Sequence, residues 1–265
     1  MSNDKFLQLE NIYKTFPLPN GKEYKAVVDV NLNIKKNEIV SIIGHSGCGK
    51  STLLNMIAGL DSQTQGHIIL NNKEITGPGP ERAVVFQNHS LLPWLTVYQN
   101  IEMAVKKVMP HLTSQELRQR VEHFVSMVNL DHAKDKFPGG ISGGMKQRVG
   151  IARALSIKPD VLLMDEPFGA LDSLTRANLQ EHLMRIQESV QNTVIIITHD
   201  IDEAVLLSDR VIMMTNGPEA TIGEILEVNL PRPRDRVALQ SDPEYIRCRE
   251  AILDFLYKKF AKDDE

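Results

Sequence analysis

Four short runs rich in apolar and β-branched residues stand out along the chain, at residues 39–43, 83–86, 161–164 and 194–198. Runs of this length and composition are typical of strands that are buried on both faces, as in a parallel sheet covered by helices. The pattern therefore predicts an α/β fold with a central parallel sheet.

Residues suited to phosphate or proton chemistry follow each of the four runs. These are the segment 44–51, Gln87, Asp165 with Glu166, and His199. Ligands of open α/β sheets bind outside the carboxyl ends of the strands. We therefore expect the four strand ends to converge on one site.

Helical patterns occupy the region between the second and third runs. They cover residues 97–108 and 113–128, and Thr113 and Glu116 have the spacing of a capping box. We predict that an α-helical subdomain, about residues 88–158, is inserted into the sheet domain.

The beginning of the chain has a different pattern. The stretches 6–12 and 26–34 are typical of strands, and a turn is predicted around Pro19-Asn20-Gly21. We expect these strands to form an antiparallel β flank of the sheet core.

The region 231–265 is predicted to be a C-terminal tail. Its arginines, Arg232, Arg234 and Arg236, alternate with Pro231, Pro233 and Asp235, and we predict that they lie in a solvated loop. A helix is predicted from near Asp242-Pro243 to near Phe260, with apolar residues at roughly helical spacing. Docking of this helix on its own domain is favoured over binding to a partner.

Composition and charge narrow the function classes. The chain has 265 residues, 42% of them hydrophobic, which is enough for a substantial core. Its formal net charge of −4 lacks the basic footprint of nucleic-acid binding, so no nucleic-acid partner is expected. Cys48 and Cys248 match no metal-ligand spacing and are predicted to be free thiols in a reducing compartment.

Membrane insertion is not predicted for this chain. The N-terminus lacks an apolar signal region, and no apolar run approaches the roughly 20 residues that span a bilayer. Any association with a membrane is therefore expected to occur through a partner.

Residues 44–51 fit the pattern G-x-x-x-x-G-K-[ST] between a predicted strand and the helical run 52–58. In such a loop the backbone N–H groups surround phosphates, Lys50 reaches the terminal phosphates and Ser51 binds magnesium. The alternative is an ordinary glycine-rich turn. The residues predicted to bind nucleotide here are Gly44, His45, Ser46, Gly47, Cys48, Gly49, Lys50, Ser51 and Thr52.

Two carboxylates directly follow the third run. Asp165 can hold magnesium, and Glu166 can polarise the water that attacks a γ-phosphate. The alternative is a helix N-cap, which Pro167 would suit.

A second predicted anion site begins at Ser142. Ser142, Gly143 and Gly144 open a predicted helix that continues to about residue 157, and glycines there permit close approach of a phosphate. A simple turn with Ser142 as N-cap is the alternative, with equal weight when this segment is taken alone.

Together these motifs resemble those of ATP-binding cassette (ABC) ATPases. The phosphate loop, Gln87, Ser142-Gly143-Gly144, Asp165-Glu166, Ala170-Leu171-Asp172 and His199 occur in the order of that family, and the resemblance covers about residues 6–225. It implies a P-loop NTPase domain over residues 6–230 with a RecA-like sheet core, and ATP and Mg²⁺ as ligands. It also implies that two such domains face head to tail and share each ATP.

The resemblance assigns roles to single residues. Gln87 is similar to the residue that links the γ-phosphate and magnesium to the membrane subunits, with Ser51 and Asp165 as further metal ligands. His199 is similar to the switch histidine that contacts the γ-phosphate and supports Glu166. Asp172 resembles the residue that communicates across the dimer, and Phe16 resembles the aromatic that stacks on adenine.

Each of these four residues also has a structural alternative: a polar strand end for Gln87, a structural histidine for His199, a helix cap for Asp172 and a core side chain for Phe16. The chain departs from the family at Ile141, where leucine is usual, and at Met145, where glutamine is common. Met145 lacks the hydrogen-bond donors of a glutamine.

Three further segments are similar to the nitrate, bicarbonate, sulfonate and taurine importers, and the nitrate or bicarbonate branch is most similar. They are residues 75–82, 92–97 and 230–234. The resemblance implies ABC permease subunits, a second ATPase subunit (the same chain or a longer paralogue) and, indirectly, a periplasmic solute-binding protein. It also implies a location on the cytoplasmic face of the inner membrane.

Several alternatives stay open at this point. Sulfonate or taurine import is one, and a soluble ABC ATPase without a transport role is another. A phosphate-loop kinase or GTPase would leave residues 142–144 and His199 without roles. We expect neither a second cassette nor a fused solute-binding domain in this chain.

Overall fold

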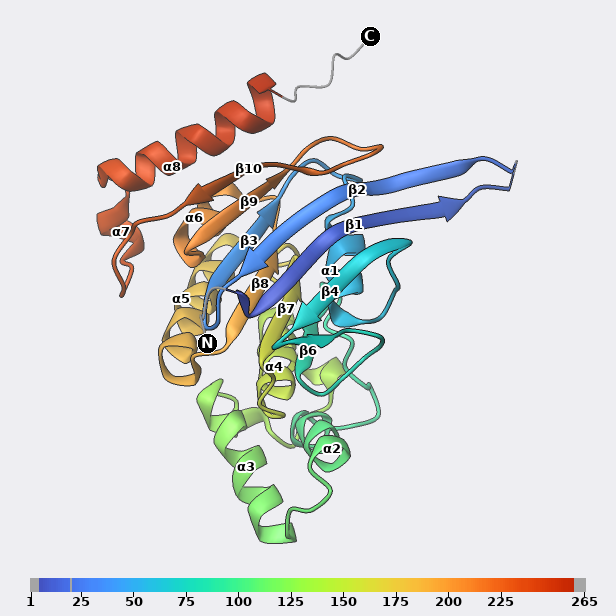
Figure 1. Cartoon of the computed structure of the whole chain (residues 1–265). Coiled ribbons are helices and arrows are strands. Elements are labelled where there is room, and N and C mark those ends of the chain that lie inside the picture. Colours follow the sequence, from blue (N-terminus) through green and yellow to red (C-terminus); the bar gives the residue numbers. More distant parts are fainter. Residues whose placement is uncertain (1–4, 20, 260–265) are drawn as a thin grey trace. The chain divides into compact units, whose positions relative to one another are not determined.

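The chain divides into two compact units in the computed structural model, which describes residues 5–19 and 21–259 (Figure 1). One unit comprises residues 1–79 and 193–265, and the other comprises residues 80–192. The second unit is thus an insertion in the sequence of the first.

The first unit contains the predicted buried strands 39–43 and 194–198. Strand β3 (Ile39–Ile43) lies between β8 (Thr193–Ile197) and β9 (Arg210–Met214), parallel to both. Strand β10 (Ile222–Glu227) adds to β9 in the antiparallel direction. Every residue of β3 and β8 is buried, which confirms the interpretation of these two runs.

The N-terminal part of this unit forms an antiparallel sheet, in the order β2-β1-β4-β5. The first two strands confirm the predicted flank but are longer than expected, and Asn20 of the predicted turn lies outside the described residues. The register places Leu7 opposite Ile34. The four strands are β1 (Leu7–Pro17), β2 (Glu23–Ile34), β4 (Gln65–Leu70) and β5 (Lys73–Glu74).

Two helices follow the strands of the parallel sheet. Helix α1 (Lys50–Ala58) packs on β8, and α6 (Ile201–Leu207) packs on β3 and β9. Since α1 follows β3 and α6 follows β8, both helices begin beyond the carboxyl ends of parallel strands.

The tail also belongs to the first unit. Helix α7 (Arg236–Leu239) precedes α8 (Pro243–Asp254), which continues as a π-helical segment (Phe255–Lys259). Helix α8 contacts α6 and buries Tyr245, Cys248 and Ile252, which agrees with docking on its own domain. Phe260, the predicted helix end, lies outside the described residues.

The prediction of a solvated arginine loop was wrong for Arg234. Its side chain is buried because it donates hydrogen bonds to four backbone carbonyls, those of Val205, Leu206, Ser208 and Leu230. A guanidinium has five N–H donors in a fixed fork, so such a carbonyl cluster can replace water around it.

The second unit carries two parallel strands and the helices α2 to α5. Strand β6 (Arg82–Val85) pairs with β7 (Val161–Asp165). Helices α2, α3 and α4 lie within the range predicted for the inserted subdomain, and α4 packs on the other two, on α5 and on β6. The helices are α2 (Val97–Val108), α3 (Ser114–Met127), α4 (Gly143–Leu155) and α5 (Ser173–Val190), with short 3₁₀ helices at Asp131–Ala133 and Pro138–Gly140.

Among the residues that the structure describes, no helix combines the length and the apolar character that crossing a bilayer requires.

The capping box at the start of α3 is formed as predicted. Thr113 Oγ1 accepts a hydrogen bond from Glu116 N (3.3 Å), and Glu116 Oε2 accepts one from Thr113 N (2.8 Å). The hydrogen bonds that the carboxylate accepts from Thr113 N and Thr113 Oγ1 lower the pKa of Glu116, because they stabilise its ionised form.

We predict that Thr113→Ala lowers the free energy of unfolding by about 1 kcal/mol, because one N-terminal amide of α3 loses its acceptor. The control Thr113→Ser keeps the hydroxyl and should change the free energy by less than about 0.5 kcal/mol. Urea unfolding followed by circular dichroism measures both. Equal losses in the two variants would show that the hydroxyl does not stabilise the helix.

Candidate active site

The phosphate loop connects β3 to α1 in the first unit. Gly49 precedes α1 with a left-handed backbone (φ 90°), and a Cβ there would lie 2.8 Å from Val27 Cγ2. The Lys50 side chain is buried and folds back over the loop, where Nζ donates to Gly44 O (2.8 Å) and His45 O (2.9 Å). The loop thus combines a fixed ammonium group with the N-terminus of a nine-residue helix, an arrangement that attracts anions.

Cys48 is buried within the loop, and His45 connects the loop to the tail. Cys48 is fully buried, which raises the pKa of its thiol, although the nearby Lys50 ammonium partly offsets the effect. His45 Nε2 lies 3.0 Å from the carbonyl oxygen of Leu256 in the π-helical segment after α8. The sequence contains no signal for this second contact, because the two residues are far apart in the chain.

His199 lies at the same edge of the sheet as the phosphate loop. Strands β3 and β8 are parallel neighbours, with Ile42 opposite Ile197, so the segments that follow them leave the sheet together. His199 is exposed and precedes Asp200, which caps α6 by accepting a hydrogen bond from Glu203 N (3.0 Å). The first unit therefore brings two of the four predicted strand ends together.

Phe16 lies on β1 and is half-buried, so it is not the fully buried core side chain of the alternative interpretation. The ammonium of Lys14 lies over one face of its ring in a cation–π contact, 4.8 Å from the ring centroid. Lys14 is itself paired with Asp61 (2.6 Å).

The second unit brings together the other two strand ends. Gln87 and Glu166 follow the parallel strands β6 and β7, and Gln87 Nε2 donates to Glu166 Oε2 (3.1 Å). Asp165 is the last residue of β7 and is half-buried. The next helix begins only at Ser173, so the two carboxylates do not have the N-cap role of the alternative interpretation.

Glu166 has a left-handed backbone conformation (φ 43°). A side chain with a Cβ rarely adopts this region, and residues held there cluster at functional sites. Glu166 shares this conformation with several other non-glycine residues, so the strain adds to its motif but does not single it out.

Ser142 and Asp172 are both helix caps in the second unit. Ser142 Oγ accepts from Met145 N (3.3 Å) at the start of α4, and Asp172 Oδ1 accepts from Thr175 N (3.0 Å) at the start of α5. Hydrogen bonds from Thr175 lower the pKa of Asp172. Capping does not exclude anion binding, because both residues are exposed and other first-turn amides remain available.

Gly144 allows α4 and α5 to approach closely. A Cβ on Gly144 would lie 2.5 Å from Thr175 Cγ2, so a larger residue would require the Thr175 side chain or the helices to move. The glycine therefore leaves room for Thr175 between the segments that carry Ser142 and Asp172.

Comparison with known proteins identifies the family. The sequence profile of the ABC transporter family matches residues 27–169, more than half of the chain. The nitrate transport protein NasD of Klebsiella oxytoca is 58% identical over 257 residues, covering 97% of this chain and 98% of NasD. This chain belongs to the ABC transporter family. It is an ATP-binding and ATP-hydrolysing subunit, as the resemblance of its motifs implied.

A second relative and a solved structure extend the comparison. The bicarbonate transport ATP-binding protein CmpC of a Synechocystis species is 58% identical over 95% of this chain, which spans 38% of CmpC. Among solved structures, the dimeric ATP-binding cassette MJ0796 bound to ADP and Pi superposes on this chain with a TM-score of 0.73. The two sequences are 33% identical, and the match covers 85% of this chain and 100% of the MJ0796 chain. These matches confirm the P-loop NTPase fold with its mixed sheets.

Arg153 holds the segment that follows Gln87, a role that the sequence did not predict. Arg153 on α4 donates to Ser90 O (2.7 Å) and to His89 O (3.2 Å). Both acceptor residues have left-handed backbone conformations and lie two and three residues after Gln87. An arginine inside an amphipathic helix carries no local signal for such a role, so only the structure reveals it.

Proposed function

We propose that this cassette is the ATPase subunit of a nitrate importer, bound to permease subunits on the cytoplasmic face of the membrane. The observation that carries the proposal is the 58% identity with NasD along nearly the whole length of both chains. The similarity to CmpC keeps bicarbonate as the second candidate. Sulfonate or taurine import is not favoured.

Within the ATPase, the phosphate loop supplies the anion site. The amides of the loop and of the first turn of α1 donate hydrogen bonds to the phosphates. Lys50 Nζ exchanges part of its hydrogen bonding to Gly44 O and His45 O for contacts with the terminal phosphates. Phe16 offers a half-buried aromatic face for the adenine ring.

Ser51, Gln87 and Asp165 are proposed to hold the magnesium that accompanies ATP. All three have oxygen donors, which Mg²⁺ prefers. The described residues contain no group of three or more His, Cys, Asp or Glu side chains that could hold a metal. This fits magnesium, which is usually bound through few protein ligands together with waters and substrate phosphates. When bound, the metal ion neutralises charge that develops on the transferred phosphoryl group.

Glu166 is proposed to orient and polarise the attacking water, while His199 contacts the γ-phosphate and supports Glu166. The hydrogen bond from Gln87 Nε2 holds one carboxylate oxygen of Glu166 in place. A positioned base of this kind contributes roughly 10²–10⁴-fold to a rate.

A complete site is proposed to need a second ATPase subunit. Ser142 and Gly143 would face the ATP held by the phosphate loop of the partner, and Asp172 would communicate across the contact. The dimeric state of the MJ0796 cassette with ADP and Pi supports this arrangement. The partner is the same chain or a longer paralogue, and a periplasmic solute-binding protein would deliver the transported ion to the permease.

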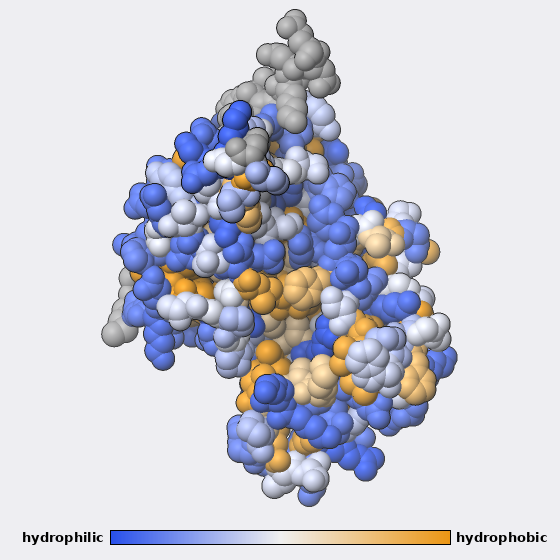
Figure 2. All heavy atoms as spheres, turned by 90° about the vertical axis from the view of Figure 1, so that its right-hand side faces the viewer, coloured by the Kyte–Doolittle hydropathy of each residue, from blue (hydrophilic) through white to orange (hydrophobic). Residues whose placement is uncertain are grey.

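The permease is proposed to contact the segment that follows Gln87. Trp94 in this segment is 67% exposed, and Met103 and Phe137 of the same unit are also exposed. Figure 2 shows hydrophobic side chains at the surface among hydrophilic ones on one face of the molecule. An exposed tryptophan is a frequent energetic centre of a protein interface.

We predict that Glu166→Gln retains ATP binding and lowers hydrolysis at least about 100-fold, because an amide keeps the shape of the carboxylate without its basicity. Bound ATP should then persist, and an ATP-dependent dimer should accumulate. Phosphate release and light scattering measure the two effects. Hydrolysis at the wild-type rate would remove Glu166 from the mechanism.

We also predict that Ser142→Arg abolishes hydrolysis while ATP binding stays within about three-fold of wild type, because a long side chain at the start of α4 blocks the approach of the partner's phosphate, whereas Lys50 and the phosphate loop are unchanged. If the chain pairs with itself, mixing with Lys50→Ala chains restores part of the activity, since some dimers keep one intact site. A Ser142→Arg chain that hydrolyses ATP at the wild-type rate contradicts the shared site.

The transported ion is tested by uptake. In cells whose only copy of this chain carries Lys50→Ala, uptake of isotopically labelled nitrate at micromolar concentration should be lost, and uptake of labelled bicarbonate should be unchanged. Cells with the wild-type copy are the control. Loss of bicarbonate uptake with normal nitrate uptake would favour the second candidate instead.

A further inference from the structure

The C-terminal tail holds helix α6 at its carboxyl end. The last four carbonyls of any helix lack partners within it, and in a seven-residue helix they are most of the total. Arg234 Nη1 lies 3.0 Å from Val205 O, 2.9 Å from Leu206 O and 2.8 Å from Ser208 O. The positive charge also suits the negative end of the helix dipole.

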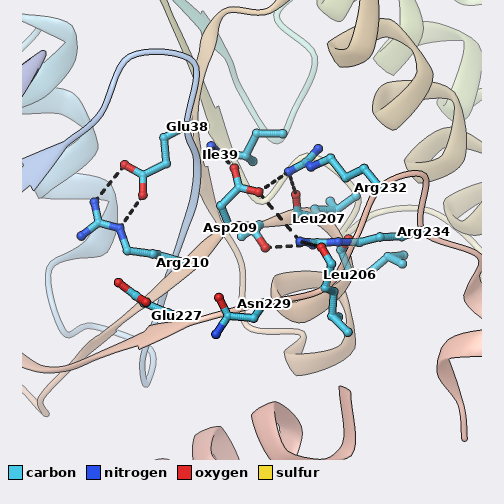
Figure 3. Close-up of polar contacts among 12 residues, drawn as sticks. Glu38, Ile39, Leu206, Leu207, Asp209, Arg210, Glu227, Asn229, Arg232 and Arg234 are labelled. Carbon is cyan, nitrogen blue, oxygen red and sulfur yellow. Dashed lines mark hydrogen bonds and ion pairs between the residues drawn. The ribbon is translucent and has the colours of Figure 1, made fainter. Parts of the chain in front are cut away.

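The surroundings of Arg234 keep it in place. Arg232 donates to Leu207 O (3.3 Å) and to Asp209 Oδ1 (2.7 Å), and Arg234 Nη2 lies 3.8 Å from the same carboxylate oxygen. Figure 3 shows both arginines directed toward the end of this helix. Burial lowers the pKa of Arg234 to about 10, so the guanidinium is still charged at neutral pH.

The tail also holds the first turn of α6. Tyr245 on α8 donates its hydroxyl hydrogen to Asp202 Oδ1 (2.7 Å), and Arg249 forms an ion pair with the same carboxylate (2.5 Å). The ring of Tyr245 is buried. Two separate parts of the tail therefore contact opposite ends of one helix.

Helix α6 is too short to be stable alone, because isolated helices below about 12 residues are marginal in water. It begins two residues after His199, and Asp200 between them is the N-cap residue. The backbone at His199 is consequently set on one side by the buried strand β8 and on the other by a helix that depends on tertiary contacts.

We propose that Arg234 and Tyr245 are positioning residues for His199: they clamp α6 and thereby fix the imidazole relative to the phosphate loop at the same edge of the sheet. The inference rests on the proposed role of His199 in hydrolysis. Arg234, which the sequence suggested was solvated, is on this proposal part of the support of the active site.

Tyr245→Phe is the central test, because it removes one hydroxyl and keeps the buried ring. The full-length chain in its complex with the permease should show a kcat about three- to ten-fold lower with KM for ATP within about two-fold, since misplacing a catalytic group costs rate rather than binding. The control Tyr257→Phe, at a side chain that is 66% exposed, should change neither constant. An unchanged kcat in Tyr245→Phe overturns the proposal.

A second pair of variants tests the arginine. Arg234→Lys keeps the charge but lacks the planar fork that reaches several carbonyls, so kcat should fall in the same way. Arg247→Lys is the matched control, because Arg247 lies on α8 and contacts Glu244 and the carbonyl of Glu227 instead of α6. Equal kcat values in these two variants overturn the role of Arg234.

A double-mutant comparison separates positioning from general stability. In a His199→Ala background, Tyr245→Phe should change the residual hydrolysis rate by less than about 1.5-fold, because variants that act through one group are not additive. The same fold-loss in both backgrounds would mean that Tyr245 does not act through His199. The single His199→Ala variant tests the underlying role: wild-type turnover there contradicts the proposed function itself, whatever Tyr245→Phe does.

Discussion

The parallel pairing of β3 with both β8 and β9 is the constraint on which the first unit depends. All five residues of β3 are buried, so a shift by one position would exchange the side chains that pack on its two covered faces. The register places Ile42 opposite both Ile197 and Ile212. Because the three strands run in one direction, the phosphate loop and His199 leave the sheet at one edge.

Polar contacts at the opposite ends of these strands reinforce the register. Glu38, just before β3, forms an ion pair with Arg210 at the start of β9, and Asp209 Oδ2 accepts from Ile39 N (2.9 Å) (Figure 3). Asp209 also forms an ion pair with Arg232 of the tail. One acidic residue therefore connects the start of the central strand to the segment that holds α6.

The candidate catalytic residues share a physical pattern in each unit. They lie where a buried strand ends, and the backbone there is held by local hydrogen bonds or by strain: Lys50 by two loop carbonyls, Glu166 in a left-handed conformation, His199 before a capped helix. Rigid placement of this kind is what electrostatic and acid–base catalysis require, because the groups must be oriented before the reaction begins. Ser142 fits this pattern as well, because it is the N-cap residue of α4 and is exposed. An exposed helix N-terminus is accessible to an ATP held by a second chain, as we propose.

Local patterns in the sequence determined much of this structure. Four apolar runs identified strands, a capping box identified the start of α3, and the phosphate-loop motif identified the turn before α1, because each depends on residues close together in the chain. Strands β4, β5, β9 and β10 were missed. Exposed residues interrupt the apolar patterns of β4 and β10, and β5 has only two residues, whereas β9 has a buried apolar run like those of the predicted strands. The half-buried position of Phe16, the tether from Arg153 to the Gln87 loop and the burial of Arg234 were decided only by the tertiary structure. The carbonyls that bind Arg234 come mainly from residues more than 25 positions earlier, and a guanidinium can lose its water only where folding has brought such acceptors together.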